Sequence, residues 1–396
     1  MIFVNKGSNN MKICHVCLAC FYVENMGYQE NILPQLHVKM GHDVFVLTSD
    51  YSFNNKYETV YREHKNYTNS FGVNVKILNR STRYGYLSRF NDYDGVYDSL
   101  TEERPDIIFV HGGQFIALLD IIKYCKQFPH TKLFIDQHAD WYNTPVKTLK
   151  QNITQRLIYG FGIRKAVPYV STFWGVTPWR CEYLNKVYKV PKEKIKLLVM
   201  GGDDRYIHLN DKIKIRQKIR KELDLNDNDF VLITGGKIDS AKNIDVLMRA
   251  VAKINKTNLK LIVFGQPNEQ MHDIIKSLSR DEHIRNIGWI NSKSVYDYFL
   301  ASDLAIFPGT HSVLWEQACA CGIPGVFKDW AGMHHVDVGG NARFIKGTDI
   351  TELISVISEL SNLNDTYTKM KNIAQTKAIK VFSYKEIAKL SIGANK

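Results

Sequence analysis

The chain has 396 residues, of which 44% are hydrophobic and 23% are charged. This composition is typical of folded globular proteins and excludes a mostly disordered chain. Because one domain usually takes about 100–200 residues, two domains with separate cores are expected. The formal net charge of +12 favours acidic partners, and most of the excess lies in the first half of the chain.

No window of the sequence approaches the roughly 18 consecutive apolar residues of a membrane-spanning helix, and we expect no secretory leader. Seven cysteines, an odd number at low density, fit a reducing compartment. We therefore expect a cytoplasmic protein. Residues 1–11 precede the first regular pattern and are expected to form an N-terminal tail.

From Lys12 onward, short apolar runs alternate with longer amphipathic runs, which predicts strands and helices that take turns in parallel sheets. A helix is predicted at 31–40, ended by Gly41, and another at 243–254, with Ile244, Leu247 and Val251 on one face. The predicted strands are 12–20, 43–50, 106–111, 132–137, 196–200, 230–236, 259–265, 283–290, 303–309 and 323–329.

The expected fold class is α/β, with two facing Rossmann-like, doubly wound domains and a ligand cleft between them. The polar, glycine-led segment 201–212 fits a hinge. We expect a first domain over 12–203, a second over 204–380, and a C-terminal helix at 381–396 that returns to the first domain.

The segment GGKIDSAKN, residues 235–243, follows a predicted strand and precedes a predicted helix. Lys237 and Lys242 then flank a helix N-terminus, where free N–H groups and the helix dipole favour an anion. Two ammonium groups there would neutralise a diphosphate and stabilise a nucleoside diphosphate as it leaves. An ordinary loop with two solvated lysines is the alternative.

A second candidate segment, residues 307–326, runs from a strand through a proline and glycine turn into a short helix near Leu314. Glu316 in its first turn could accept two ribose hydroxyls, while preceding N–H groups meet phosphate or sugar oxygens. A carboxylate that only caps the helix is the alternative.

The motifs GHDVFVLTSD (41–50), GGKIDSAKN, IGWI (287–290), SDLAIFPG (302–309) and WEQACACGIP (315–324) resemble, in this order and spacing, retaining GT-B glycosyltransferases of family 4. The resemblance implies a nucleotide-sugar donor, with UDP the favoured nucleotide, as co-substrate. It implies no metal and no other cofactor.

The resemblance also implies residue roles. Lys237 and Lys242 would bind the donor diphosphate, Glu316 the ribose, and His138 would lie near the reacting sugar. The implied catalytic residues are His138, Lys242 and Glu316, and the implied donor-binding residues are Gly27, Gly236, Lys237, Lys242, Trp289, Ile290, His311, Ser312, Val313, Leu314 and Glu316.

The sequence departs from the family pattern eight residues before Glu316, where Pro308 replaces a glutamate that contacts the donor sugar. His311 and Ser312 are the nearest polar side chains that could take its place. On the acceptor side, we expect His111 and Asp140 to accompany His138, with a histidine that only satisfies a strand-end carbonyl as the alternative for His111.

Two clusters have the residue types of metal sites. Cys14, Cys17 and Cys20 have iron–sulfur spacing, but on a strand they cannot converge, so we interpret them as small buried hydrophobes. His334 and His335 with Asp337 lack metal spacing and are interpreted as a loop.

The stretch from Lys147 to Lys196 is strongly basic and includes aromatic residues beside Arg164 and Lys165. A solvated helical face would explain it, and so would peripheral contact with an anionic membrane at its inner face. No nucleic-acid-binding module accompanies the charge.

We therefore expect a glycosyltransferase that moves a hexose or hexosamine to a lipid-linked or polysaccharide acceptor in cell-surface glycan synthesis. A nucleotide-sugar epimerase of the same architecture and a non-catalytic polyanion-binding protein are the alternatives. An epimerase would convert the donor without an acceptor, and Pro308 is the feature that keeps the non-catalytic alternative open.

Overall fold

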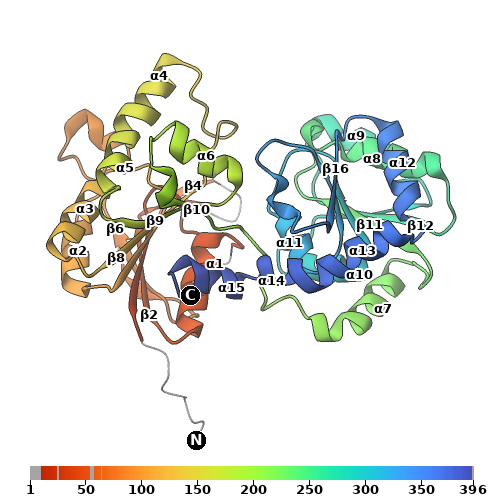
Figure 1. Cartoon of the computed structure of the whole chain (residues 1–396), viewed down its shortest axis with the longest axis horizontal. Coiled ribbons are helices and arrows are strands. Elements are labelled where there is room, and N and C mark those ends of the chain that lie inside the picture. The colour runs from red at the N-terminus through yellow and green to blue at the C-terminus, as the bar shows by residue number, and fades with distance from the viewer. Residues whose placement is uncertain (1–9, 25, 54–57, 64, 395–396) are drawn as a thin grey trace, which may run out of the picture. The chain divides into compact units, whose positions relative to one another are not determined.

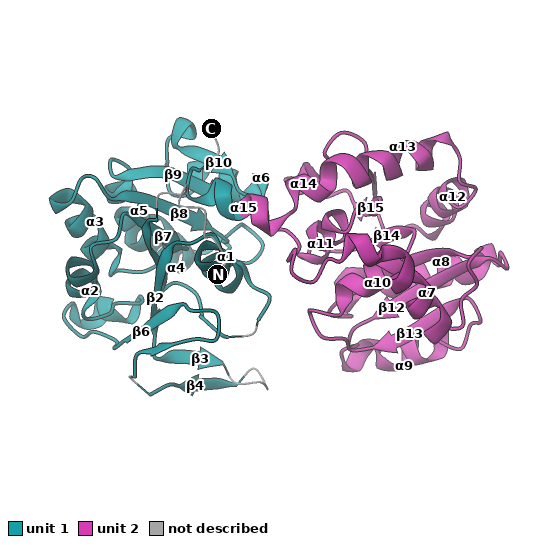
Figure 2. Cartoon of the chain, turned by 90° about the horizontal axis from the view of Figure 1, so that it is seen from below, with its two compact units in different colours: residues 1–198, 388–396 teal, residues 199–387 magenta. Residues whose placement is uncertain are grey.

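The computed structural model describes residues 10–394 apart from 25, 54–57 and 64, so most of the expected tail lies outside the described residues. The chain divides into two compact units (Figure 2). Unit 1 comprises residues 1–198 and 388–396, and unit 2 comprises residues 199–387. The chain passes from unit 1 to unit 2 after residue 198, rather than after residue 203.

Unit 1 contains an eight-stranded sheet in which neighbouring strands are parallel except at β5 (Figure 1). Strands β1 (Lys12–Cys17) and β7 (Ile107–His111) lie side by side at its centre, which gives a doubly wound order. From edge to edge the strands are β10 (Ile195–Leu197), β9 (Val170–Gly175), β8 (Lys132–Gln137), β7 (Ile107–His111), β1 (Lys12–Cys17), β2 (Asp43–Ser49), β6 (Asn74–Leu78) and β5 (Tyr67–Thr68). A separate hairpin joins β3 (Tyr51–Phe53) to β4 (Thr59–Tyr61).

The two faces of this sheet have different character. Cys14 and Val16 face a large apolar core together with Ile108 and Val110, because alternate residues of a strand share a face. The helices that close this core are α2 (Val96–Glu103), α3 (Leu118–Gln127), α5 (Gly160–Ala166) and α6 (Pro178–Lys186). The opposite face carries His15, whose ring stacks against His37 of α1 (Gln29–Lys39). Figure 1 shows α1 beside this sheet.

Unit 2 contains a six-stranded sheet that is parallel throughout. Its order places the first three strands on one side and the last three on the other, the order of dinucleotide-binding Rossmann domains. From edge to edge the strands are β13 (Ile284–Gly288), β12 (Leu259–Phe264), β11 (Phe230–Gly235), β14 (Leu304–Phe307), β15 (Gly325–Lys328) and β16 (Ala342–Ile345).

Amphipathic helices cover the sheet of unit 2. In α8 (Ile244–Ile254), the side chains of Ile244, Leu247 and Val251 are buried in the core, as their spacing predicts. The other helices are α7 (Lys212–Glu222), α9 (Glu269–Leu278), α10 (Val295–Ala301), α11 (Leu314–Ala320), α12 (Ile350–Leu360), α13 (Asp365–Ile373) and α14 (Ile379–Val381). Helix α15 (Tyr384–Ser391) begins in unit 2 and ends in unit 1.

Most predicted strands are confirmed to within two residues at each end. The strand predicted at 12–20 ends at Cys17, and the one predicted at 196–200 is the short β10. The prediction omits β6, β9 and β16, and also the short strands β3, β4 and β5. Gly41 adopts φ +93°, as the predicted helix end requires. Among the described residues, every helix is too short or too polar to cross a bilayer.

A first prediction concerns Gly265, which has φ +119° and whose added Cβ would lie 1.8 Å from the Gly236 carbonyl oxygen. Gly265→Ala should lower the free energy of unfolding by at least about 3 kcal/mol, because strain and a backbone clash combine. Gly288→Ala is the control: φ is +67° and no atom lies within 4 Å. Its expected loss is about 1 kcal/mol. Equal losses in urea unfolding would contradict the clash.

Candidate functional site

The predicted donor-binding residues of unit 2 gather at the carboxyl ends of its strands. Gly236 follows β11, Trp289 follows β13, and His311 lies in the turn after β14. Backbone contacts tie these turns together, since Gly236 N donates to Phe264 O at 3.0 Å and Gly265 N donates to Gly288 O at 2.7 Å. Strands β11 and β14 flank the point where the strand order reverses, which is where Rossmann domains bind ligands.

Lys242 and Lys237 differ in their surroundings. Lys242 is half-buried, and its Nζ donates to the carbonyl oxygens of Thr310 and His311 at 2.7 and 3.3 Å. Burial, with the nearby charge of Lys237, lowers the pKa of Lys242. The Lys237 side chain is 78% exposed, and its Nζ lies 3.9 Å from Asp239. Lys242 is thus fixed in place, whereas Lys237 extends into solvent.

The turns after β11 and β14 pack directly against each other. Thr310 N donates to Ala241 O at 3.0 Å, and Asn243 Nδ2 donates to Pro308 O at 3.0 Å. A side chain at Gly309 would collide with the backbone of Lys242, 2.2 Å away. The structure therefore brings Lys242 together with the segment that carries His311 and Ser312.

Glu316 lies in the first turn of α11 and is completely buried. Its Oε1 accepts from the Nε2 atoms of His311 and His335, each at 2.8 Å. Burial by itself would raise the pKa of Glu316, but the charges and hydrogen bonds of His311 and His335 hold it well below its usual range. The carboxylate is thus the charged centre of a three-residue cluster.

This cluster has the donor set of a metal site, because one ligand atom of each residue lies within 4.8 Å of the others. One N–H···O hydrogen bond from each histidine to Glu316 Oε1 accounts for the two 2.8 Å contacts. Glu316 Oε2 and His335 Nδ1 are buried without a hydrogen-bond partner. Because Glu316 is completely buried, a ribose could reach it only after His311 or another covering residue moves.

The remaining donor-side residues surround this cluster. His311, Ser312, Val313 and Leu314 form the half-buried approach to α11, and Leu314 Cδ1 lies beside Gly236. Trp289 is 70% exposed just beyond β13, and Ile290 is partly buried.

In unit 1, the predicted residues also follow strand ends. Gly27 is exposed in the loop between β1 and α1, and His138 follows β8 with 37% of its side chain exposed. Asp140 is nearly buried, accepts from Arg180 Nε at 3.1 Å and from the backbone N–H groups of Tyr142 and Asn143. Asp140 therefore holds the turn after β8 rather than facing solvent.

His111 was expected to face a ligand, but its side chain is 1% exposed. Its Nδ1 lies 3.1 Å from Asp136 Oδ2, and its Nε2 lies 3.0 Å from His15 Nδ1. It also does not satisfy a strand-end carbonyl, the alternative expectation. His111 was expected to face a ligand because it ends a strand and precedes Gly112 and Gly113, but that position does not distinguish a face covered by a helix from an open one.

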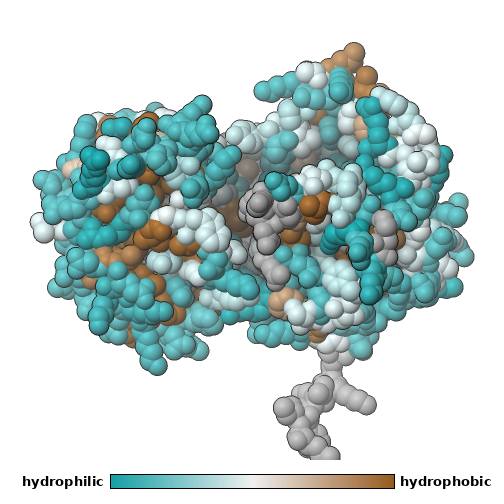
Figure 3. Space-filling model, turned by 180° about the vertical axis from the view of Figure 1, so that it is seen from behind, coloured by the Kyte–Doolittle hydropathy of each residue, from teal (hydrophilic) through white to brown (hydrophobic). Residues whose placement is uncertain are grey.

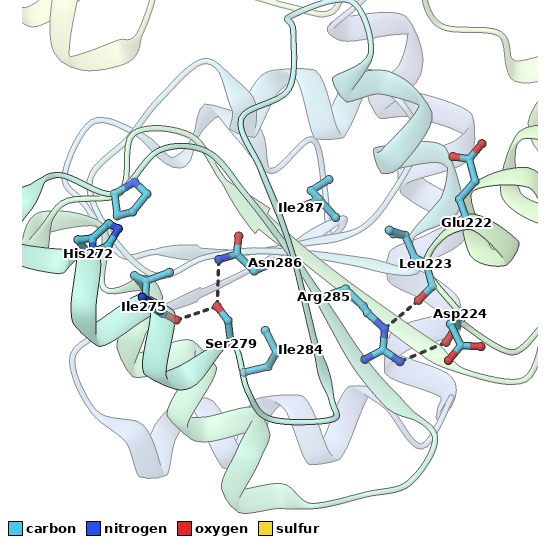
Figure 4. A pocket seen from close by; sticks show the side chains of 12 residues that line it. Glu222, Leu223, Asp224, His272, Ile275, Ser279, Ile284, Arg285, Asn286 and Ile287 are labelled. Atoms are coloured by element: carbon cyan, nitrogen blue, oxygen red, sulfur yellow. Dashed lines mark hydrogen bonds between the residues drawn. The ribbon is translucent and has the colours of Figure 1, made fainter.

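A cavity of about 600 Å³ in unit 2 lies elsewhere, along β13 and α9 (Figure 4). Arg285 crosses it to donate to the carbonyl oxygens of Leu223 and Asp224, at 2.8 and 3.2 Å, as Figure 4 shows. None of the residues that line it is a predicted site residue.

Sequence reasoning missed two functional candidates. His335, interpreted as part of a loop, lies in a short 3-10 turn and reaches Glu316. Asp136 is buried between His111 and His138, with His138 Nε2 3.2 Å from Asp136 Oδ2. The D-x-H spacing of Asp136 and His138 was the available signal, because alternate residues share one face.

Comparisons with known proteins bear on the family and the fold. Residues 215–377 match the family described as glycosyl transferases group 1. A D-inositol 3-phosphate glycosyltransferase of Stackebrandtia nassauensis is 26% identical over 201 residues, which cover 46% of this chain and 44% of that protein. The matched region spans less than half the length of the curated relatives.

Solved structures resemble the whole chain. A glycosyltransferase from Rickettsia africae ESF-5 has a TM-score of 0.69 at 12% identity and covers 98% of both chains. The Anabaena protein Alr3699/HepE, solved with UDP and glucose, has a TM-score of 0.63 at 16% identity and covers 96% of this chain and 98% of its own. The expected fold class, with two Rossmann-like domains of the GT-B type, is thereby confirmed.

A second prediction concerns Glu316. Glu316→Gln should lower the free energy of unfolding at pH 7 by about 1–3 kcal/mol, because two buried imidazoles lose a charged acceptor. A carboxylate with a lowered pKa stabilises the fold above its unfolded pKa of about 4.3, so the difference should shrink below that pH. Glu359→Gln, in an exposed pair with Arg343, should cost less than about 0.5 kcal/mol. Urea unfolding from pH 3 to 7 measures both, and equal losses would contradict the assignment.

Proposed function

We propose that this chain is a retaining glycosyltransferase that moves a hexose or hexosamine from a nucleotide sugar to an acceptor. UDP is the favoured nucleotide, and the acceptor is a lipid-linked or polysaccharide glycan of the cell surface. The observation that carries the proposal is the placement of Lys242 at the strand-order reversal of unit 2, within the region that matches glycosyl transferases group 1. The Anabaena neighbour with bound UDP supports the choice of nucleotide.

The donor diphosphate would bind where Lys242 meets the turn after β14. Lys242 already contacts the segment that precedes α11, and the exposed Lys237 side chain could turn toward an anion there. A diphosphate would exchange the Lys242 contacts with two carbonyl oxygens for stronger charge-assisted hydrogen bonds. Both ammonium groups would then stabilise the charge that develops on the leaving group, without a metal ion.

The nucleoside and the sugar would occupy the flanks of this anion site. The backbone at Trp289 and Ile290 is the proposed contact for the base. We propose that Glu316 binds the ribose after the His311 side chain moves. His311 and Ser312 would contact the sugar in place of the glutamate that Pro308 replaces. On unit 1, His138 is the proposed residue near the reacting sugar, because its ring is partly exposed and held by Asp136.

An exposed apolar row on unit 1 supports peripheral contact with an anionic membrane. One continuous helix runs through α4 (Leu149–Asn152), a π-helical segment (Ile153–Tyr159) and α5. Leu149, Ile153, Leu157 and Phe161 lie four residues apart along it and are 41–78% exposed. Figure 3 shows hydrophobic atoms at the outer tip of this helix.

Basic residues accompany this row. Lys147, Lys150 and Lys165 are exposed beside it, and the sequence from 147 to 181 contains no acidic residue. An apolar strip with positive charge beside it is complementary to an anionic lipid surface. We propose that this helix brings unit 1 to a membrane-bound acceptor.

A third prediction tests the donor site. Lys242→Ala should weaken UDP binding at least about tenfold, which corresponds to the loss of one charge-assisted hydrogen bond. Lys253→Ala is the control, since Lys253 is exposed at the other end of α8. Calorimetric titration with UDP measures both, and thermal unfolding shows whether each variant is folded. An unchanged dissociation constant for Lys242→Ala would contradict the site.

Product analysis tests the reaction itself. Transfer of sugar from UDP-sugar to a glycan acceptor, with release of UDP, is the expected result. Interconversion of the donor in the absence of acceptor would indicate an epimerase instead. Binding of polyanions without either reaction would indicate a non-catalytic protein.

A fourth prediction tests the membrane contact. The double variant Leu149→Glu with Leu157→Glu should lose most of its co-sedimentation with phosphatidylglycerol vesicles, because both changes remove apolar contact and add repulsion. Ile213→Glu is the control, because Ile213 is 74% exposed on α7 of unit 2. Equal binding by the double variant and the control would contradict the proposal, as would equal binding to phosphatidylcholine vesicles by the unaltered protein.

A further inference from the structure

A row of buried histidines crosses the α1 face of the unit 1 sheet. His15 comes from β1, His111 from β7 and His37 from α1, and each is at most 1% exposed. In the sheet, His15 lies opposite Phe109, two residues before His111, and His111 lies opposite Asp136 of β8. Alternate and paired positions share a face, so these side chains meet one another.

Hydrogen-bond distances join these groups into one chain with four links. Asp136 Oδ2 lies 3.1 Å from His111 Nδ1, and His111 Nε2 lies 3.0 Å from His15 Nδ1. His15 Nε2 lies 2.9 Å from His37 Nδ1. His37 Nε2 lies 3.0 Å from the carbonyl oxygen of Ala388, in the C-terminal segment of unit 1.

The number of protons in this chain follows from its two ends. An ionised carboxylate and a backbone carbonyl can only accept hydrogen bonds, and each neutral imidazole supplies one N–H. Four links therefore need four N–H groups, whereas three neutral rings supply three. With three protons, one link must place two lone pairs against each other at about 3 Å.

Ser391 does not remove this shortage. Its hydroxyl donates to Ala388 O at 2.7 Å and lies 3.3 Å from His37 Nε2. If that hydroxyl turned to His37 instead, Ala388 O and the unprotonated Nε2 would still face each other 3.0 Å apart. An N–H at His37 Nε2 donates to the Ala388 carbonyl oxygen, and the Ser391 hydroxyl keeps its own hydrogen bond to that oxygen.

We propose that this chain holds one proton more than three neutral rings supply, and that the resulting imidazolium is His111, paired with the Asp136 carboxylate. His15 and His37 then stay neutral, each with its N–H at Nε2, and all four links are made. The extra proton locks the C-terminal segment onto the sheet through Ala388. It also fixes Asp136 as a positioning residue for His138, whose ring contacts the same carboxylate oxygen.

The surroundings place the charge at the Asp136 end. Burial, with the charges of neighbouring histidines, lowers the pKa of His15, and burial lowers the pKa of His37 to about 4. Asp136 Oδ1 accepts from Gly112 N at 2.9 Å, which favours the ionised carboxylate. The other titratable groups that act on this row or on its Asp136 end are His138 after β8, Glu30 of α1, His42 after α1 and Cys17 of β1, and Arg180 of α6 acts on His138.

The inference is independent of the proposed reaction, and two variants at one position test it. His37→Gln preserves the proton count, because its amide donates to Ala388 O and its oxygen accepts from His15. His37→Met removes the two links that His37 makes. The two remaining links need two N–H groups, which neutral His111 and neutral His15 supply.

The expected result follows from linkage. Above the unfolded histidine pKa of about 6.5, the folded protein holds a proton that the unfolded chain does not. Such a proton stabilises the fold at lower pH, and the stabilisation is lost as pH rises. Between pH 7 and the pH at which the histidine row releases this proton, the unfolding constant of the unaltered protein divided by that of His37→Met should rise about tenfold per pH unit. His37→Gln should follow the unaltered full-length protein. Parallel curves for the unaltered protein and His37→Met would overturn the proposal.

A second measurement applies even if His37→Met does not fold. Nitrogen NMR of the full-length protein with ¹⁵N-labelled histidine rings should show, at pH 8, one buried ring with both nitrogens protonated. That signal should persist in His138→Gln and disappear in His111→Gln. Absence of such a ring in the unaltered protein, or its loss only in His138→Gln, would overturn the proposal.

Discussion

Parallel strands end together at one edge of a sheet, and this constraint organises both units. In unit 2 the turns after β11 and β14 pack against each other at Gly309, and the turns after β11 and β12 meet at Gly236 and Gly265. Lys242 and the approach to α11 meet there for that reason. In unit 1 the same geometry places His111 at the end of β7 and His138 directly after β8, on either side of Asp136. The two units therefore carry different side chains at equivalent strand ends of similar parallel sheets.

Each unit buries a carboxylate between two imidazoles near that edge. Glu316 lies between His311 and His335, and Asp136 lies between His111 and His138. A buried carboxylate is costly unless partners offset its desolvation, so these four histidines are structural requirements as well as candidate functional groups. The low pKa of both carboxylates follows from those partners in spite of burial.

The sequence predicted what depends on local pattern. Apolar runs located most strands, and the spacing in 243–254 located the buried face of α8. Lys242 was placed correctly at a strand-to-helix turn because that turn is contiguous in sequence. His335 was missed because it lies nineteen residues beyond Glu316, and only the turn after β15 brings the two together. The His15, His37 and His111 chain was missed because it depends on strand order and on the return of the chain at Ala388, neither of which a single sequence encodes locally.

The π-helical segment Ile153–Tyr159 gives the exposed apolar row its direction. In a regular α-helix, successive residues turn by about 100°, so positions four apart drift steadily around the axis. A π-helical turn is wider, so it reverses that drift and keeps Leu149, Ile153, Leu157 and Phe161 in line. In a regular α-helix of the same length, the three steps of four residues from Leu149 to Phe161 would add up to a rotation of about 120°. The π-helical segment therefore sets the phase between the two ends of this helix, so that Leu149 and Phe161 can face the same surface.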